Sequence, residues 1–187
     1  MNLPNILTLS RIVMIPVFVA VFYLPVEWRY VVSAALFAVA GATDWLDGYL
    51  ARKLNQSTPF GAFLDPVADK LMVAVALTVL IEDYATLALT LPAMVIIGRE
   101  IVISALREWM AEMGSRASVA VSYIGKIKTT AQMVSIFLLL AAPPGGMLAS
   151  FGLALLYLAA ILTLWSMVLY LKAAWPDLFP EQEQKPS

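Results

Sequence analysis

The chain has 187 residues, of which 61% are hydrophobic and only 13% are charged. Soluble globular domains carry about 25% charged residues, so we expect this chain to have the lipid bilayer as its main solvent. The net charge of −1 gives no indication of a nucleic-acid partner. The sequence contains neither Cys nor His, which excludes disulfides, thiolate and imidazole metal ligands, and catalysis by His.

Six stretches satisfy the requirement of a membrane-spanning helix for roughly 20 mostly apolar residues. In chain order they cover residues 5–24, 30–50, 60–81, 86–109, 124–142 and 148–171. A Pro-Pro-Gly-Gly turn divides the last two spans. The sequence therefore predicts an all-α fold, with a six-helix transmembrane catalytic domain over residues 1–175. The short polar tail over residues 176–187 is predicted to be disordered.

The distribution of Lys and Arg predicts the orientation, because these residues favour cytoplasmic loops. With six spans, six basic residues fall on one side: Arg52, Lys53, Arg116, Lys126, Lys128 and Lys172. The opposite connections hold Arg29 and three acids: Glu27, Glu82 and Asp83. We expect both termini to be cytoplasmic, and the N-terminal stretch to begin the first helix rather than to be a cleaved signal peptide.

Four aspartates lie where the second and third spans meet the predicted cytoplasmic side. Asp44 and Asp47 are three residues apart, and Asp65 and Asp69 are four apart. Residues at these spacings share one face of a helix. The short loop between the two spans makes them antiparallel neighbours, so the two carboxylate pairs can face each other.

Carboxylates gathered in this way repel one another strongly where water is scarce. Oxygen-only ligands suit Mg²⁺, Mn²⁺ or Ca²⁺, and two such ions form a clamp for phosphoryl transfer. The sequence therefore predicts a site for two divalent ions, with Mg²⁺ or Mn²⁺ as cofactor. The alternative is that the aspartates are interfacial charges that end helices. Gly48 and Gly61 allow close approach either of a ligand or of a neighbouring helix.

The same segment resembles the signature of the CDP-alcohol phosphotransferases. The pattern is Asp-Gly-x2-Ala-Arg-x8-Gly-x3-Asp-x3-Asp, with a further Asp three residues earlier. Every fixed position matches: Asp44, Asp47, Gly48, Ala51, Arg52, Gly61, Asp65 and Asp69.

The resemblance implies a six-helix membrane fold over most of the chain and a homodimer. It also implies that Asp44, Asp47 and Asp65 bind metal. Asp69 would be the general base, placed to reach the second metal ion. Three residues would lie along the CDP moiety: Gly48, Arg52 and Gly61.

Three further segments are similar to the phosphatidylglycerophosphate synthase branch of this family. They are residues 2–11, the Gly-Arg-Glu sequence at 98–100 and residues 125–132. The likeness implies phosphatidyl transfer from CDP-diacylglycerol, held among membrane lipids, to glycerol 3-phosphate. The products would be phosphatidylglycerophosphate and CMP, made at a bacterial inner membrane.

The phosphate of such an acceptor needs a basic site of its own. Arg99, Arg107 and Lys126 are predicted to provide it, because Arg matches phosphate oxygens bidentately. The alternative is that the two arginines pair with their neighbours Glu100 and Glu108. Arg116 and Lys128 are expected only to follow the positive-inside rule. Asn5 and Thr8 are predicted either to contact the nucleotide or to cap the first helix.

Three rival interpretations stay open at this stage. One is another member of the family, a cardiolipin, phosphatidylserine or phosphatidylinositol-phosphate synthase with a different acceptor. Another is a divalent-metal transporter or channel that uses the aspartates as an intramembrane ion site. The last is an inactive homologue that acts as a scaffold, which the complete aspartate set disfavours.

Overall fold

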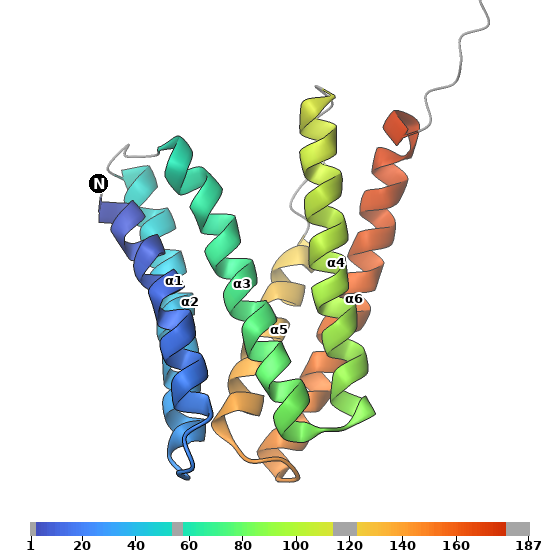
Figure 1. The fold of residues 1–187 in the computed structure, drawn as a ribbon. Coiled ribbons are helices and arrows are strands. Elements are labelled where there is room, and N and C mark those ends of the chain that lie inside the picture. The colour runs from blue at the N-terminus through green and yellow to red at the C-terminus, as the bar shows by residue number, and fades with distance from the viewer. Residues whose placement is uncertain (1–2, 54–57, 114–122, 179–187) are drawn as a thin grey trace, which may run out of the picture.

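The computed structural model describes residues 3–53, 58–113 and 123–178, and within these ranges it contains six α-helices and no strand. The helices are α1 (Leu3–Phe22), α2 (Arg29–Lys53), α3 (Pro59–Tyr84), α4 (Leu87–Glu112), α5 (Tyr123–Ala141) and α6 (Met147–Leu178) (Figure 1). Each expected span corresponds to one of them, so the all-α prediction is confirmed. Of the predicted tail, residues 176–178 belong to α6, and residues 179–187 lie outside the described residues.

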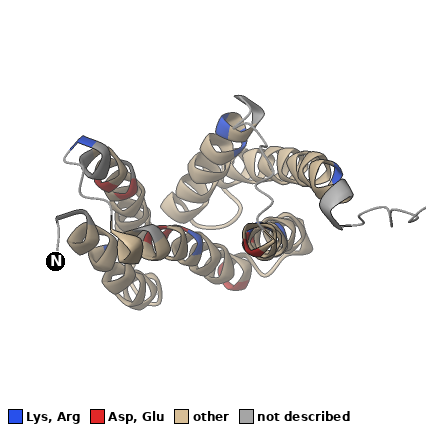
Figure 2. Ribbon diagram, turned by 90° about the horizontal axis from the view of Figure 1, so that it is seen from above, with Lys and Arg blue, Asp and Glu red and all other residues tan. Residues whose placement is uncertain are grey.

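Four of these helices, α1, α2, α4 and α6, are by themselves long and apolar enough to cross a membrane. The other two carry charge along their length: α3 holds Asp65, Asp69 and Lys70, and α5 begins with Lys126 and Lys128. Seen along the helices, most of the ribbon is uncharged, and the charged residues occupy few positions (Figure 2).

The apolar core joins all six helices. Its fully buried side chains include Phe18 of α1, Phe37 of α2 and Leu77 of α3, with Ile96 of α4, Ile136 of α5 and Leu156 of α6. Large apolar side chains also cover the outside of the bundle, among them Val31, Ile101 and Ile161. An apolar exterior of this kind suits contact with lipid rather than water.

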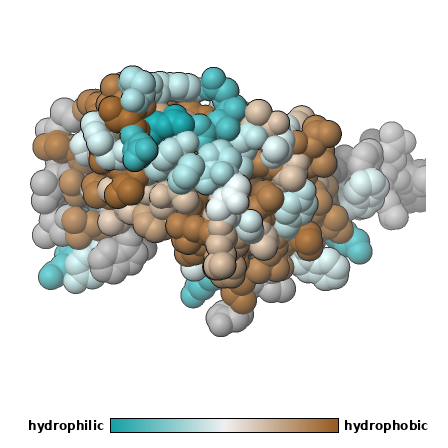
Figure 3. Space-filling view, turned by 90° about the horizontal axis from the view of Figure 1, so that it is seen from below, coloured by the Kyte–Doolittle hydropathy of each residue, from teal (hydrophilic) through white to brown (hydrophobic). Residues whose placement is uncertain are grey.

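Polar side chains connect α1, α2 and α3 at the end of the bundle that faces downward in Figure 1. Arg29 of α2 donates from Nη1 to the Phe22 carbonyl of α1 at 2.9 Å and from Nη2 to Asp83 of α3 at 2.8 Å. Tyr23 also donates to Glu82. From this side a hydrophilic patch is visible among hydrophobic side chains (Figure 3).

The opposite end brings together the beginning of α1, the end of α2 and the beginning of α3 (Figure 1). Helix α3 begins here because Thr58 caps it, accepting from the Gly61 N–H at 3.0 Å, and Pro59 occupies the first helical position. The four aspartates lie in these parts of α2 and α3. The ends of α4 and α6 lie on the same side of the molecule.

Candidate functional site

The first part of the site is a set of aspartates that converge on Arg11 of α1. Arg11 Nη1 lies 2.5 Å from Asp44 Oδ1, and Arg11 Nη2 lies 2.5 Å from Asp47 Oδ2. Arg11 Nη2 also lies 3.6 Å from Asp65 Oδ1 on α3. The expectation that carboxylates from the two helices face each other therefore holds for these three aspartates.

Thr8, one helical turn before Arg11, connects the same carboxylates. Its hydroxyl lies 2.5 Å from Asp65 Oδ1 and 3.2 Å from Asp47 Oδ2. The hydroxyl can donate one proton at a time, and the shorter distance favours Asp65. Thr8 is thus placed by α1 at the junction of α2 and α3, beside the aspartates.

Burial divides this aspartate group into an inner and an outer part. The side chains of Arg11 and Asp47 are only 2% and 3% exposed, whereas those of Asp44 and Asp65 are 44% and 43% exposed. Three carboxylates around one guanidinium leave a net charge of −2. The exposed outer pair can therefore accept further positive charge from outside the protein.

The donor set fits a hard divalent cation, since it consists of carboxylate oxygens and retains negative charge. Among the residues that the structure describes, no three acidic side chains are grouped closely enough to form a cage around one ion. The Arg11 guanidinium instead lies at the position where Asp44, Asp47 and Asp65 converge.

The interpretation of the sequence missed Arg11, although a signal was present. Arg11 is the only charged residue in the otherwise apolar stretch 5–24. An ionisable side chain inside such a span normally has a specific partner or function. The partners are the aspartates that the spacing had already identified.

Asp69 lies one helical turn beyond Asp65 on α3, and its side chain is exposed. It lines a small cavity together with Arg11, and it also lines a larger pocket formed by α3, α4, α5 and α6. Asp69 therefore connects the aspartate group to that pocket.

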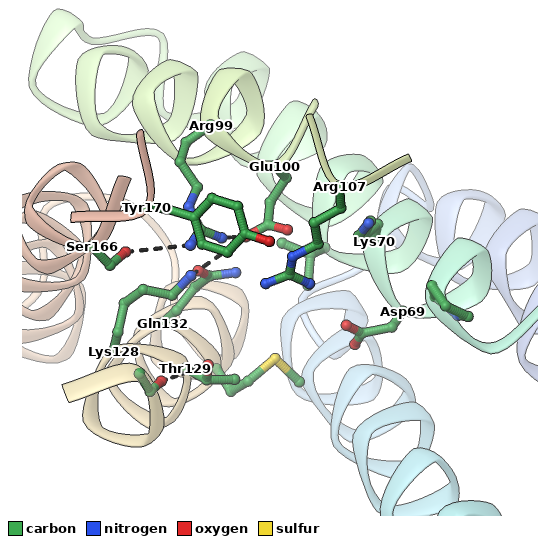
Figure 4. Close-up of a pocket in the computed structure, with 14 residues that line it drawn as sticks. Asp69, Lys70, Arg99, Glu100, Arg107, Lys128, Thr129, Gln132, Ser166 and Tyr170 are labelled. Carbon is green, nitrogen blue, oxygen red and sulfur yellow. Dashed lines mark hydrogen bonds and ion pairs between the residues drawn. The ribbon is translucent and has the colours of Figure 1, made fainter. Parts of the chain in front are cut away.

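The larger pocket has a volume of about 440 Å³ and is rich in basic side chains. Its charged residues are Asp69, Lys70, Arg99, Glu100, Arg107 and Lys128 (Figure 4). Four cations and two carboxylates give it a formal charge of +2. This charge is complementary to a small dianion such as a phosphate monoester.

Arg99 and Lys128 are held in the wall of this pocket by Glu100. Arg99 Nη1 donates to Glu100 Oε1 at 2.8 Å, and Lys128 Nζ donates to the same oxygen at 3.4 Å. Arg99 Nη2 also donates to Ser166 Oγ of α6 at 3.3 Å. The alternative interpretation, in which Arg99 pairs with its neighbour Glu100, is thus observed, and the pair lies within the pocket itself.

The structure brings Arg99 and Arg107 together, as the sequence predicted, but with Lys128 rather than Lys126. Lys126 is exposed and lines a different surface pocket, formed by α5 and Leu155 of α6. Residues two apart on a helix point in different directions. Only one of these two lysines can therefore face α3 and α4. The sequence shows that both are basic, but not which of them faces the pocket.

Asn5 of α1 and Gly61 of α3 lie close together at this end. Asn5 Nδ2 donates to Thr58 Oγ1 at 2.9 Å. A Cβ at Gly61 would lie 2.6 Å from Asn5 Oδ1, whereas a Cβ at Gly48 would meet nothing within 4 Å. Gly61 thus permits helix packing, while Gly48 leaves space open beside Asp47. The side chain of Arg52 and the whole of Arg116 lie outside the described residues.

An all-α bundle with apolar helices, an aspartate group and an adjoining basic pocket defines the molecule as a membrane-embedded enzyme that handles phosphorylated substrates. The chain belongs to the CDP-alcohol phosphatidyltransferase family, whose family model matches residues 1–165. Membership confirms the resemblance seen in the aspartate motif. Together with the apolar helices, it makes the chain an integral membrane protein.

Curated relatives cover almost the whole chain. A Pseudomonas fluorescens protein is 58% identical over 180 residues, which is 95% of this chain and 92% of the relative. Proteins of Salmonella typhimurium and Escherichia coli K12 are also 58% identical over 180 residues, which is 96% of this chain and 98% of each relative. All three are named CDP-diacylglycerol–glycerol-3-phosphate 3-phosphatidyltransferase.

Proposed function

We propose that this chain transfers the phosphatidyl group of CDP-diacylglycerol to glycerol 3-phosphate, producing phosphatidylglycerophosphate and CMP. The observation that carries the proposal is that Asp69 lines the basic pocket and also a small cavity lined by Arg11, the residue that pairs with Asp44 and Asp47. A hydroxyl acceptor in the pocket and a pyrophosphate at the aspartates would then meet at Asp69. The names and the 58% identity of the relatives support the same reaction.

The donor's pyrophosphate is proposed to lie at Asp44, Asp47 and Asp65, which together with Asp69 would hold two divalent ions, Mg²⁺ or Mn²⁺. When bound, such ions supply positive charge that stabilises the transferred phosphate and the departing CMP. Within the aspartate group, the exposed carboxylates of Asp44 and Asp65 are the ones accessible to such ions. The open backbone at Gly48 gives the cytidine moiety room to pass along α2, with Arg52, Gly61, Asn5 and Thr8 as further candidate contacts.

The acceptor is proposed to place its phosphate against Arg99, Arg107 and Lys128, with Lys70 on the α3 side. Glu100 keeps Arg99 and Lys128 in the pocket wall. The formal charge of +2 in the pocket balances the dianion. Lys126, which the sequence suggested, lies on another face of α5, so Lys128 replaces it in the proposal.

In the transfer step, Asp69 takes the proton of the acceptor's primary hydroxyl. The hydroxyl oxygen forms a bond to the phosphorus that carries the diacylglycerol. The bond from that phosphorus to the oxygen of CMP breaks, and its electron pair leaves with CMP. Since the chain has neither His nor Cys, direct transfer without a covalent enzyme intermediate is the simplest route.

The setting of the reaction is part of the proposal. We infer that all six helices span a bacterial inner membrane, with both termini and the aspartate end on the cytoplasmic side, from which glycerol 3-phosphate would enter. The positions of the basic residues support this orientation. A homodimer is expected from the family resemblance.

An acceptor panel tests the proposal. Purified protein in detergent–lipid micelles is supplied with CDP-diacylglycerol labelled in the cytidine, and CMP release is measured with Mg²⁺ or Mn²⁺. Glycerol 3-phosphate is expected to support release, whereas serine, inositol phosphate and phosphatidylglycerol are not. Release with one of those instead would assign the chain to another reaction of the family. Absence of release with every acceptor, combined with metal uptake into vesicles, would favour a transporter.

A further inference from the structure

The two arginines of the basic pocket are held in different ways. Arg99 uses Nη1 to bind Glu100 and Nη2 to bind Ser166, and its Nε is buried without a hydrogen-bond partner. Its side chain is therefore largely committed to contacts within the protein. Arg107, eight residues later on α4, has an exposed side chain.

Arg107 is positioned by an aromatic ring rather than by an acid. Its guanidinium carbon lies 5.3 Å from the centroid of the Tyr170 ring of α6. Both side chains line the pocket, and Arg107 points into its interior (Figure 4). Within the described part of the chain, no acidic side chain lies within ion-pair distance of Arg107.

This difference matters for anion binding. A guanidinium presents its five N–H donors at its edge, in the plane of the group. An ion pair with an acid consumes some of these donors, whereas a cation–π contact engages the guanidinium without any oxygen acceptor. Arg107 can therefore be restrained by Tyr170 and still offer its donors to a phosphate.

The ring of Tyr170 comes from a part of the chain outside the aspartate motif. Tyr170 lies on α6 beyond residues 1–165, the part that the family model matches. The aspartates on α2 and α3 lie within that part. The aspartate motif and Tyr170 thus come from separate parts of the chain. Asp69 of the motif and Tyr170 both line the basic pocket.

We propose that Tyr170 is a positioning residue that holds the Arg107 guanidinium, through a cation–π contact, in the orientation that binds the phosphate of the acceptor. The inference rests on the proposed function and deepens it by naming what prepares the acceptor site. Restraining a long side chain before binding reduces the entropy lost when the substrate binds. Tyr170 then affects the KM for the acceptor but not the KM for CDP-diacylglycerol.

The test compares Tyr170→Leu with Tyr170→Phe in the full-length protein. Steady-state kinetics are measured with glycerol 3-phosphate and CDP-diacylglycerol varied separately. Loss of the ring in Tyr170→Leu is expected to raise the KM for glycerol 3-phosphate about three- to tenfold, the size of a cation–π contact. The kcat and the KM for CDP-diacylglycerol should stay near wild type. Tyr170→Phe keeps the ring and should retain the wild-type KM.

Two controls make the result specific. Tyr157→Leu changes an exposed tyrosine of α6 outside the pocket and should have no effect. In an Arg107→Ala background, Tyr170→Leu should add nothing further, because its effect acts through Arg107. A full additional increase in that background would overturn the proposal.

Other outcomes also decide the question. A raised KM in Tyr170→Phe would show that the hydroxyl, and not the ring, is what matters. An unchanged KM in Tyr170→Leu would also refute the positioning role of Tyr170. The proposed function would still hold in that case if the wild-type protein transfers the phosphatidyl group to glycerol 3-phosphate. Failure of the wild-type protein itself to use glycerol 3-phosphate would refute the proposed function instead.

Discussion

Arg11 Nη2 and Asp47 Oδ2 lie 2.5 Å apart in an ion pair whose two side chains are almost completely buried between α1 and α2. Removing one partner of a buried pair leaves the other charge without compensation, which usually costs about 3–5 kcal/mol. Arg11→Met is therefore expected to lower the free energy of unfolding by about this amount. Thermal unfolding in detergent, followed by intrinsic fluorescence in a chelator, measures the change.

Lys172→Ala, at an exposed basic residue of α6, is the control for this variant and should unfold like the wild type. If divalent ions bind the aspartates, adding Mg²⁺ or Mn²⁺ should raise the unfolding temperature of Arg11→Met, because the added charge replaces the guanidinium. An unfolding temperature of Arg11→Met equal to that of the wild type would contradict the structural importance of the pair.

The assignment of Asp69 as general base predicts a loss of turnover without a loss of donor binding. General-base catalysis contributes about 100- to 10,000-fold, so Asp69→Asn should reduce kcat by at least about 100-fold. Binding of CDP-diacylglycerol, measured by protection against thermal unfolding, should persist. Glu112→Gln, at an exposed acid near the end of α4, serves as the control. Near-normal turnover in Asp69→Asn would remove this residue from the mechanism.

The two lysines at the start of α5 provide a matched pair. Lys128→Met removes a buried cation from the basic pocket and should raise the KM for glycerol 3-phosphate about tenfold or more, as expected for a hydrogen bond to a charged group. Lys126→Met removes the same charge from a different surface and should leave this KM unchanged. The reverse pattern would assign Lys126, which the sequence predicted, to the phosphate site instead of Lys128.

The two glycines of the aspartate motif should respond differently to the same change. Gly61→Ala places a methyl group 2.6 Å from Asn5 Oδ1 and should destabilise the protein by about 1–3 kcal/mol through overpacking. Gly48→Ala meets open space and should not destabilise it, because Ala favours the helix by about 1 kcal/mol.

If the cytidine moiety passes over Gly48, Gly48→Ala should instead raise the KM for CDP-diacylglycerol. Thermal unfolding and steady-state kinetics on the same preparations separate the two effects. A destabilised Gly48→Ala with an unchanged KM would make Gly48 a packing residue as well.

The aspartate pairs could be predicted from sequence because helical spacing alone determines which side chains share a face. Asp44 and Asp47, and then Asp65, lie together as that spacing requires. The partner supplied by Arg11 was not predicted, because it comes from α1 and depends on how three helices pack. Spacing within α2 and α3 contains no information about α1.

The basic pocket was predicted less completely for the same reason. Arg99 and Arg107 are eight residues apart on α4, so their common face follows from the helix. Which lysine of α5 joins them depends on the rotation of α5 about its axis. Tyr170 could not be recognised at all, because an aromatic residue near the end of an apolar helix is usually an interfacial anchor. Helix α6 also continues to Leu178, past the expected membrane span over residues 148–171.

The stoichiometry of the reaction tests the central claim most directly. Purified protein is incubated with CDP-diacylglycerol and glycerol 3-phosphate, each labelled differently, and CMP and phosphatidylglycerophosphate are quantified over time. We predict that the two products form in equal amounts with Mg²⁺ or Mn²⁺, that a chelator stops both, and that Asp69→Asn forms neither at a comparable rate. CMP released without phosphatidylglycerophosphate, or neither product from the wild-type protein, would contradict the proposed transfer.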